Sequence, residues 1–238
     1  MPEEFDCTKC CAILLPSLNP NEKFDRVVDG LREAGFEKIM IVDDGSDAQH
    51  QEHFSRAEAF PECEVFHHGV NKGKGRALKD GFVEIMKRFP EAEGVITIDG
   101  DGQHLTKDII ACGNRMLKDD KIVLGCRDFD LPGVPARSVA GNKTTSRMFR
   151  LYGIRLSDTQ TGLRAIPKRY LSRFCAIEGE RFEYETNMLL KMKRRGIEFV
   201  EQPIETVYED ENSGSHYDTV KDSWRIFKIM LKDLAHRR

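Results

Sequence analysis

The 238-residue sequence contains no long apolar run. No stretch approaches the roughly 20 consecutive apolar residues that a membrane-spanning helix needs, and the acidic, polar start MPEEFDCTKCC lacks the pattern of a signal peptide. The formal net charge is only −3, so the composition indicates no nucleic-acid partner for the chain as a whole. With 39% hydrophobic residues the chain can bury a sizeable core, and these features favour a soluble, cytoplasmic protein.

Paired cysteines are also scarce. Cys7 and Cys10 have the C-x-x-C spacing and Cys11 is adjacent, but a zinc site would need a second pair, and the other four cysteines occur singly. A redox site would need a helix start, whereas Cys11 leads into a strand-like run. In the cytoplasm thiols are kept reduced, so structural or incidental cysteines are the favoured interpretation.

Short apolar runs alternate with stretches of helical periodicity along most of the chain. Strands are expected at 11–15, 38–42, 64–67, 95–98 and 121–125, with helices at 21–34, 77–88 and 106–118 and one of about ten residues before 64. A polar turn from Asp158 then leads into a short strand, followed by a helix over 182–195 and a strand from Ile197 that ends before Pro203. This alternation predicts a mostly parallel α/β sheet flanked by helices, with right-handed crossovers.

The C-terminal segment has a different pattern. Residues 209–217 are predicted to form a mobile loop, and 218–236 an amphipathic helix whose apolar stripe contains Trp224. Packing of that stripe on the chain's own domain is favoured, and a position in a membrane interface is the alternative.

Acidic residues follow two of the predicted strands. The sequence DGDGQH over 99–104 comes directly after strand 95–98, and Asp43 and Asp44 come directly after strand 38–42. Carboxyl ends of parallel strands share one edge of a sheet, where open α/β sheets bind ligands. Hard divalent cations take carboxylate oxygens, and Mg²⁺ tends to use one or two of them together with substrate phosphates. An acidic turn without a ligand is the alternative that DGDG alone leaves open.

Two basic features complete the candidate site. The run NKGKGR over 71–76 opens a helix, where free backbone N–H groups and the helix dipole favour an anion, although the spacing is not that of a P-loop. A solvated basic turn is the other interpretation. Residues 137–173 contain nine basic residues and one acidic residue, a formal balance of +8. This segregation indicates a surface that meets a phosphate or an anionic membrane face, rather than a solvated helix face.

Seven motifs follow one another along the chain: LPSLN (15–19), VDDGS (42–46), NKGKG (71–75), DGDGQH (99–104), GCR (125–127), TQTGLR (159–164) and FEYE (182–185). Together and in this order they resemble those of glycosyltransferase family 2, and within it the polyprenyl-phosphate glycosyltransferases typified by dolichol-phosphate mannose synthase. The resemblance covers about residues 11–230 and implies a single GT-A (Rossmann-like) domain over 1–238. Its parts would be a nucleotide-sugar-binding half (11–126), an acceptor-binding half (127–208) and a C-terminal loop and helix (209–238).

The same resemblance implies roles for particular residues. The nucleotide-sugar-binding residues would be Pro16, Asn19, Asp43, Asp44, Lys74 and Asp99. The ligands of a Mg²⁺ or Mn²⁺ ion on the donor diphosphate would be Asp99, Asp101 and Gln103. The acceptor-phosphate-binding residues would be Arg127, Arg137 and Arg164, and the catalytic residues Asp101, Arg127 and Glu185.

The implied reaction is inverting transfer of a hexose from a UDP- or GDP-sugar. A lipid-phosphate acceptor is already ionised and needs no general base, whereas a sugar hydroxyl needs a carboxylate to take its proton. Many hydroxyl-transferring relatives carry a Glu-Asp pair, and FEYE lacks an aspartate, so a polyprenyl phosphate at the cytosolic membrane face is favoured. The enzyme would then bind the membrane peripherally, with a separate membrane-anchoring or flippase protein as a possible partner.

Two other functions stay open at this point. One is a soluble relative that uses a glycan hydroxyl, with Glu183 or Glu185 as the base; the other is a non-catalytic nucleotide-sugar-binding module. The motifs do not select the nucleotide base, the sugar or the oligomeric state.

Overall fold

The computed structural model describes residues 5–131, 134, 136–205 and 228–230. In these ranges the strands form one mixed sheet in the order β3-β2-β1-β4-β6-β5-β7. Their bounds are β1 Cys11–Ser17, β2 Ile39–Asp43, β3 Cys63–His67, β4 Gly94–Thr97, β5 Ile122–Arg127, β6 Arg164–Pro167 and β7 Phe199–Ile204. All neighbouring strands pair in parallel except β6, which is antiparallel to both β4 and β5.

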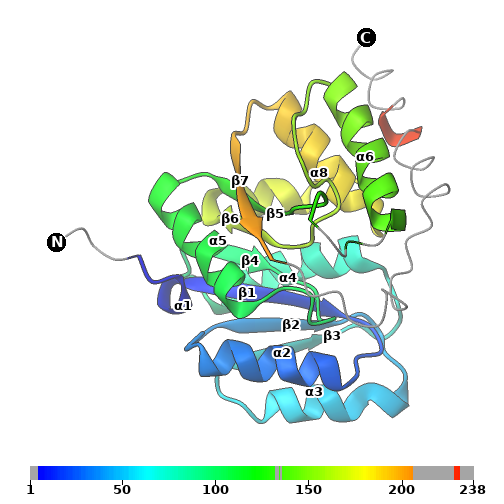
Figure 1. Cartoon of the computed structure of the whole chain (residues 1–238). Helices are drawn as coiled ribbons and strands as arrows, with labels where there is room; N and C mark the ends of the chain where they lie inside the picture. The colour runs from blue at the N-terminus through cyan, green and yellow to red at the C-terminus, as the bar shows by residue number, and fades with distance from the viewer. Residues whose placement is uncertain (1–4, 132–133, 135, 206–227, 231–238) are drawn as a thin grey trace.

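Helices cover both faces of the sheet (Figure 1). Their bounds are α1 Cys7–Cys10, α2 Glu22–Glu33, α3 Gln51–Glu58, α4 Lys74–Arg88, α5 Thr106–Asp119, α6 Ala136–Leu151, α7 Leu171–Cys175 and α8 Glu183–Arg194. Because strand side chains alternate between faces, Leu14 of β1 joins the core under α4 and α8, whereas Ile13 and Leu15 join the core under α2, α3 and α5. None of the helices in the described ranges combines the length and apolar character needed to cross a bilayer.

The predicted architecture, a mostly parallel sheet flanked by helices, is confirmed. The predicted end of the last strand before Pro203 is wrong, because β7 continues through that residue to Ile204. β7 is an edge strand, where a proline without an N–H is tolerated. Helix α4 begins at Lys74, three residues before the predicted start, and α6 was not predicted as a helix. The predicted loop 209–217 lies outside the described residues, as does the predicted helix 218–236 except for 228–230, which are helical.

The N-terminal cysteines are packed into the core. Cys7 begins the four-residue helix α1, a helix start that the sequence did not predict, and Cys7 and Cys11 are both fully buried. Burial raises the pKa of the Cys7 thiol to about 12, which suppresses the reactive thiolate at neutral pH. All seven cysteines are free thiols, and five of them are buried.

Candidate functional site

The acidic residues predicted from the sequence lie at one edge of the sheet. Asp43 is the last residue of β2, and Asp99 follows β4 by two residues. β1 lies between these strands, is parallel to both, and pairs Pro16 with Val42. The parallel arrangement therefore places both acidic strand ends at the same carboxyl edge.

Asp99 is held by two basic side chains. Its Oδ1 lies 2.7 Å from Nζ of Lys74, the first residue of α4, and its Oδ2 lies 3.7 Å from Nε2 of His104. Burial alone would raise the pKa of Asp99, but the Lys74 ammonium and the neighbouring His104 side chain outweigh burial and hold this pKa far below its usual range. Asp99 is therefore an ionised carboxylate at neutral pH.

Lys74 joins Asp99 to α8. Its ammonium lies 3.3 Å from Oε2 of Glu185 as well as 2.7 Å from Asp99. Burial would lower the pKa of Lys74, but the two carboxylates raise it above its usual range. Glu185 in turn faces the guanidinium of Arg164 at 3.8 Å. Alternating charges thus run from the end of β4 to the first turn of α8.

The pKa of Asp101 is raised, whereas that of Asp99 is lowered. Burial and the nearby charge of Asp99 raise its pKa, and its Oδ1 accepts a hydrogen bond of 3.0 Å from the backbone N–H of Gln103. Two close carboxylates repel each other, and a cation between them would relieve that repulsion. The described residues contain no cluster of three histidine, cysteine or acidic side chains arranged to hold a metal. Two carboxylates completed by phosphate oxygens and water are, however, a donor set that suits Mg²⁺ or Mn²⁺.

His104 supports a ligand at this place. Its side chain is 8% exposed, and neither ring nitrogen has a hydrogen-bond partner in the structure. Buried polar groups are nearly always hydrogen-bonded, so an imidazole that faces Asp99 at 3.7 Å without forming a hydrogen bond fits a site that a polar ligand completes. His104 was not predicted as a site residue, although it ends the DGDGQH motif.

Two glycines allow close approach of other segments to this cluster. A Cβ on Gly162 would lie 2.2 Å from Oδ2 of Asp99, so a larger residue there would displace that carboxylate. Gly75 allows α4 to pack on α8, because its Cβ would lie 2.5 Å from Cβ of Tyr184. The second contact places Lys74 and Glu185 together at the starts of their helices.

The two aspartates at the carboxyl end of β2, Asp43 and Asp44, are bound by two histidines that were not predicted as site residues. Asp43 accepts hydrogen bonds from the Ser46 backbone at 2.8 Å, from Gln51 at 3.1 Å and from Nδ1 of His67 at 2.9 Å. Burial raises the pKa of Asp43, and these donors more than offset it, so that the net shift is downward. Asp44 is bound by His68 at 2.8 Å. The sequence feature that could have indicated them is the pair of histidines, His67 and His68, at the carboxyl end of β3.

Asn19 connects the ends of β1 and β2. Its backbone N–H donates to Oγ of Ser46 at 2.8 Å, and its Oδ1 accepts from the N–H of Asp47 at 2.8 Å. Asn19 has a φ of 50°, in the left-handed region that asparagine tolerates better than most residues. This side chain therefore fixes the two loops that flank the predicted nucleoside position.

The predicted acceptor residues have different surroundings. Arg127 forms a two-pronged ion pair with the fully buried Asp158, through Nε at 2.6 Å and Nη2 at 3.1 Å. Arg164 is 2% exposed and directs its guanidinium at Glu185 and at the carbonyl of Thr161, so it has no open surface to offer an acceptor. Arg137 lies within α6, and its side chain is outside the described part of the structure.

Of the two glutamates considered as a base, only one belongs to the cluster. Glu183 accepts hydrogen bonds from the backbone N–H groups of residues 180 and 181, in the segment before α8. Glu185 instead contacts Lys74, which contacts Asp99.

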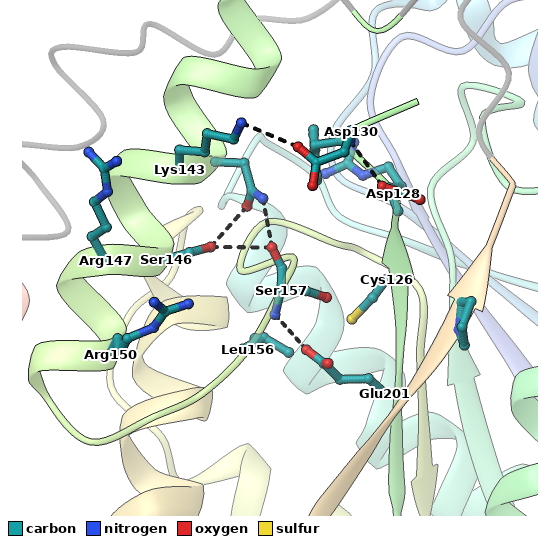
Figure 2. Close-up of a pocket in the computed structure, with 14 residues that line it drawn as sticks. Cys126, Asp128, Asp130, Lys143, Ser146, Arg147, Arg150, Leu156, Ser157 and Glu201 are labelled. Carbon is teal, nitrogen blue, oxygen red and sulfur yellow. Dashed lines mark hydrogen bonds and ion pairs between the residues drawn. The ribbon is translucent and has the colours of Figure 1, made fainter. Parts of the chain in front are cut away.

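A pocket of about 630 Å³ lies beside the carboxyl end of β5. Figure 2 shows Lys143, Ser146, Arg147 and Arg150 on one wall, α6, and Glu201 of β7 across from them. Arg127 and Ser157 also line the pocket. Lys143 pairs with Asp130 at 3.3 Å (Figure 2), whereas Arg147 and Arg150 are exposed. The pocket thus joins Arg127 to the basic segment identified in the sequence.

The comparisons with known proteins agree with these features. Residues 12–177 match the family model described as glycosyl transferase family 2, so the chain belongs to this family. The chain is 28% identical to the UDP-N-acetylglucosamine–dolichyl-phosphate N-acetylglucosaminyltransferase of Methanococcus voltae, with 94% of this chain and 95% of the relative covered. It is 26% identical to the undecaprenyl-phosphate mannosyltransferase of Micrococcus luteus, with 80% and 81% covered.

A solved structure has the same fold. It is glucosyl-3-phosphoglycerate synthase from Mycobacterium tuberculosis, in complex with Mn²⁺, UDP and phosphoglyceric acid. The TM-score is 0.63 at 15% identity, with 94% of this chain and 78% of that chain covered. The GT-A fold and the glycosyltransferase class predicted from the sequence are therefore confirmed.

Proposed function

We propose that this glycosyltransferase moves a hexose from a UDP- or GDP-sugar to a polyprenyl phosphate, with inversion at the anomeric carbon. The proposed binding of the nucleotide-sugar donor rests on one cluster of charged side chains. This cluster lies at the carboxyl end of β4 and the starts of α4 and α8, and contains Asp99, Asp101, Lys74 and Glu185. The relatives named for dolichyl and undecaprenyl phosphate support the choice of acceptor.

In this proposal the donor diphosphate lies against the acidic cluster. A divalent cation, Mg²⁺ or Mn²⁺, held by Asp99, Asp101 and Gln103 would supply Lewis-acid stabilisation of the leaving diphosphate. The ammonium of Lys74, 2.7 Å from Asp99, would donate to a phosphate oxygen and add positive charge where negative charge develops. Pro16, Asn19, Asp43 and Asp44 would shape the nucleoside position.

The acceptor would enter from the side of β5 and α6. Arg127 is ordered by Asp158 and lines the pocket with the basic residues of α6, so its guanidinium can bind a phosphate in a fixed orientation. Arg137 remains a proposed acceptor contact. Arg164 is buried, and we assign it instead to holding Glu185 in place.

The enzyme would act peripherally at the cytosolic membrane face. Lys143, Arg147 and Arg150 are exposed on α6 and would be drawn to anionic lipid head groups. Binding to vesicles that contain anionic lipid should therefore weaken as salt is raised. Equal binding to neutral and anionic vesicles would contradict this part of the proposal.

A glycan hydroxyl is the second candidate acceptor. For this acceptor, the position of Glu185 makes it a better candidate for the general base than Glu183. A hydroxyl needs a general base within the site, and Glu185 lies 3.3 Å from Lys74, whereas Glu183 is engaged with the backbone. With this acceptor, Glu185→Gln should abolish transfer yet leave metal-dependent donor hydrolysis measurable.

The deciding experiment is transfer from a panel of labelled nucleotide sugars to a short polyprenyl phosphate, with Mn²⁺ and with chelator. Label in the lipid phase only when metal is present would establish the reaction and identify the donor. Metal-dependent hydrolysis of one donor without lipid product would move the acceptor to a hydroxyl. Nucleotide binding without turnover of any donor would contradict the proposed reaction.

A further inference from the structure

His68 is a fully buried imidazole that touches acidic groups on two other elements. It follows β3 directly, and its Nδ1 lies 2.8 Å from Oδ1 of Asp44, beyond the end of β2. Its Nε2 lies 3.1 Å from Oδ2 of Asp80, in the second turn of α4. The ring also packs edge-on against Phe66, with centroids 5.6 Å apart. A buried side chain held at both ring nitrogens has one orientation.

Asp44, which binds His68, also binds the backbone of the loop before α4. Its Oδ1 accepts a hydrogen bond of 2.9 Å from the N–H of Lys72, and its Oδ2 accepts one of 2.8 Å from the N–H of Gly73. With His68, three donors occupy a carboxylate that is only 4% exposed. Asp44 therefore binds the loop backbone directly before Lys74.

The loop has little freedom to compensate if this contact is lost. Gly73 has a φ of +102°, and a Cβ there would lie 2.4 Å from the carbonyl oxygen of Glu180. The Arg76 N–H donates to that same carbonyl at 2.9 Å. The first turn of α4 is thus held between Asp44 on one side and the segment before α8 on the other.

We propose that His68 is a positioning residue: through Asp44 it holds the loop so that the Lys74 ammonium stays at Asp99 and Glu185. The contacts run without a break from the imidazole to Asp44, from Asp44 to the N–H of Gly73, and from there to the next residue, Lys74. The consequence for turnover rests on the proposed donor-binding role of Lys74. The role of His68 in holding the loop does not depend on that proposal.

Three substitutions separate the two contacts of the ring. The amide nitrogen of asparagine takes roughly the place of Nδ1, and that of glutamine the place of Nε2. His68→Asn therefore keeps a donor for Asp44, His68→Gln keeps one for Asp80, and His68→Leu removes both. His53→Gln is the matched control, because His53 also binds an aspartate, Asp25 at 2.8 Å, between α2 and α3.

The first measurement is the acylation rate of Lys74, followed by mass spectrometry without any donor present. Lys87, which is 73% exposed, serves as the internal reference. We expect Lys74 to react several-fold faster in His68→Gln and His68→Leu than in the wild type, and at the wild-type rate in His68→Asn and His53→Gln. An unchanged Lys74 rate in His68→Gln would overturn the proposal.

The second measurement is turnover of the nucleotide sugar. A displacement of about 1 Å of a catalytic group can cost about 100-fold, so we expect His68→Gln to lose about 10- to 100-fold in kcat and His68→Asn to recover most of it. Equal impairment of the two variants would contradict the Asp44 contact as the cause. If the leucine variant does not fold, the asparagine and glutamine pair still decides, since both place an amide at the buried position. If the wild type transfers no sugar but the Lys74 rates differ as expected, the positioning role stands and the proposed function fails.

Discussion

The sharpest prediction concerns Gly162, which touches the Asp99 carboxylate from β6's side of the site. Its substitution by alanine would put a Cβ 2.2 Å from Oδ2 and 2.8 Å from Cγ of Asp99, whereas ordinary van der Waals contact begins at 3.4 Å. The shortfall is about 1.2 Å from these distances, and the carboxylate must move by a comparable amount. The ion pair of 2.7 Å with Lys74 resists that movement on the opposite oxygen.

The expected cost follows from this displacement. A catalytic group misplaced by about 1 Å loses about 100-fold in rate, which corresponds to about 2.7 kcal/mol of transition-state stabilisation. We therefore expect Gly162→Ala to lower kcat for metal-dependent transfer or donor hydrolysis by about 100-fold, with a smaller effect on the melting temperature. The assay is turnover at saturating donor, combined with thermal unfolding.

Gly69→Ala is the matched control. Nothing lies within 4 Å of a Cβ at that position, so neither turnover nor stability should change appreciably. Wild-type turnover in Gly162→Ala would refute the reasoning, because it would show that the Asp99 carboxylate can be moved at no cost to the reaction.

Three further predictions test other parts of the site. Asp101→Ala should abolish metal-dependent turnover while the far-ultraviolet circular dichroism spectrum stays native, and retained activity would exclude Asp101 as a metal ligand. Arg137→Ala should raise KM for the polyprenyl phosphate more than Kd for the donor nucleotide, and equal effects on both would contradict its acceptor role. Burial lowers the pKa of His67, but Asp43 and Glu58 raise it more, so the net shift is upward. The ion pairs of protonated His67 therefore stabilise the folded state below the unfolded pKa of about 6.5. This stabilisation is lost as pH rises through the folded pKa. His67→Gln should therefore lower the melting temperature more at about pH 5.5 than at about pH 8.5, and the reverse order would show that this ion pair does not stabilise the fold.

The sequence by itself was sufficient for the class of fold and for the common edge of the sheet at which the acidic strand ends lie. Strand and helix periodicities are local, so the alternating elements could be recognised without knowledge of their packing. The parallel connection of β1, β2 and β4 then places Asp43 and Asp99 at one edge. The seven motifs were specific enough, taken together, to predict the family that residues 12–177 match.

Contacts between distant segments were decided only by the tertiary structure. β6 enters antiparallel between β4 and β5, and this places Gly162 against Asp99, a contact that no local pattern indicates. The meeting of Lys74 and Glu185 depends on the packing of α4 on α8 through Gly75.

The surroundings of single polar side chains were also beyond the sequence. The basic residues 137–173 read as one anion-binding surface, yet Arg164 is buried against Glu185 while Arg147 and Arg150 are exposed. His68 was indistinguishable from a surface histidine until β2, β3 and α4 came together around it. A side chain's charge and type are local properties that the sequence states, whereas its burial and its partner depend on which elements pack together, and those long-range contacts are what folding decides.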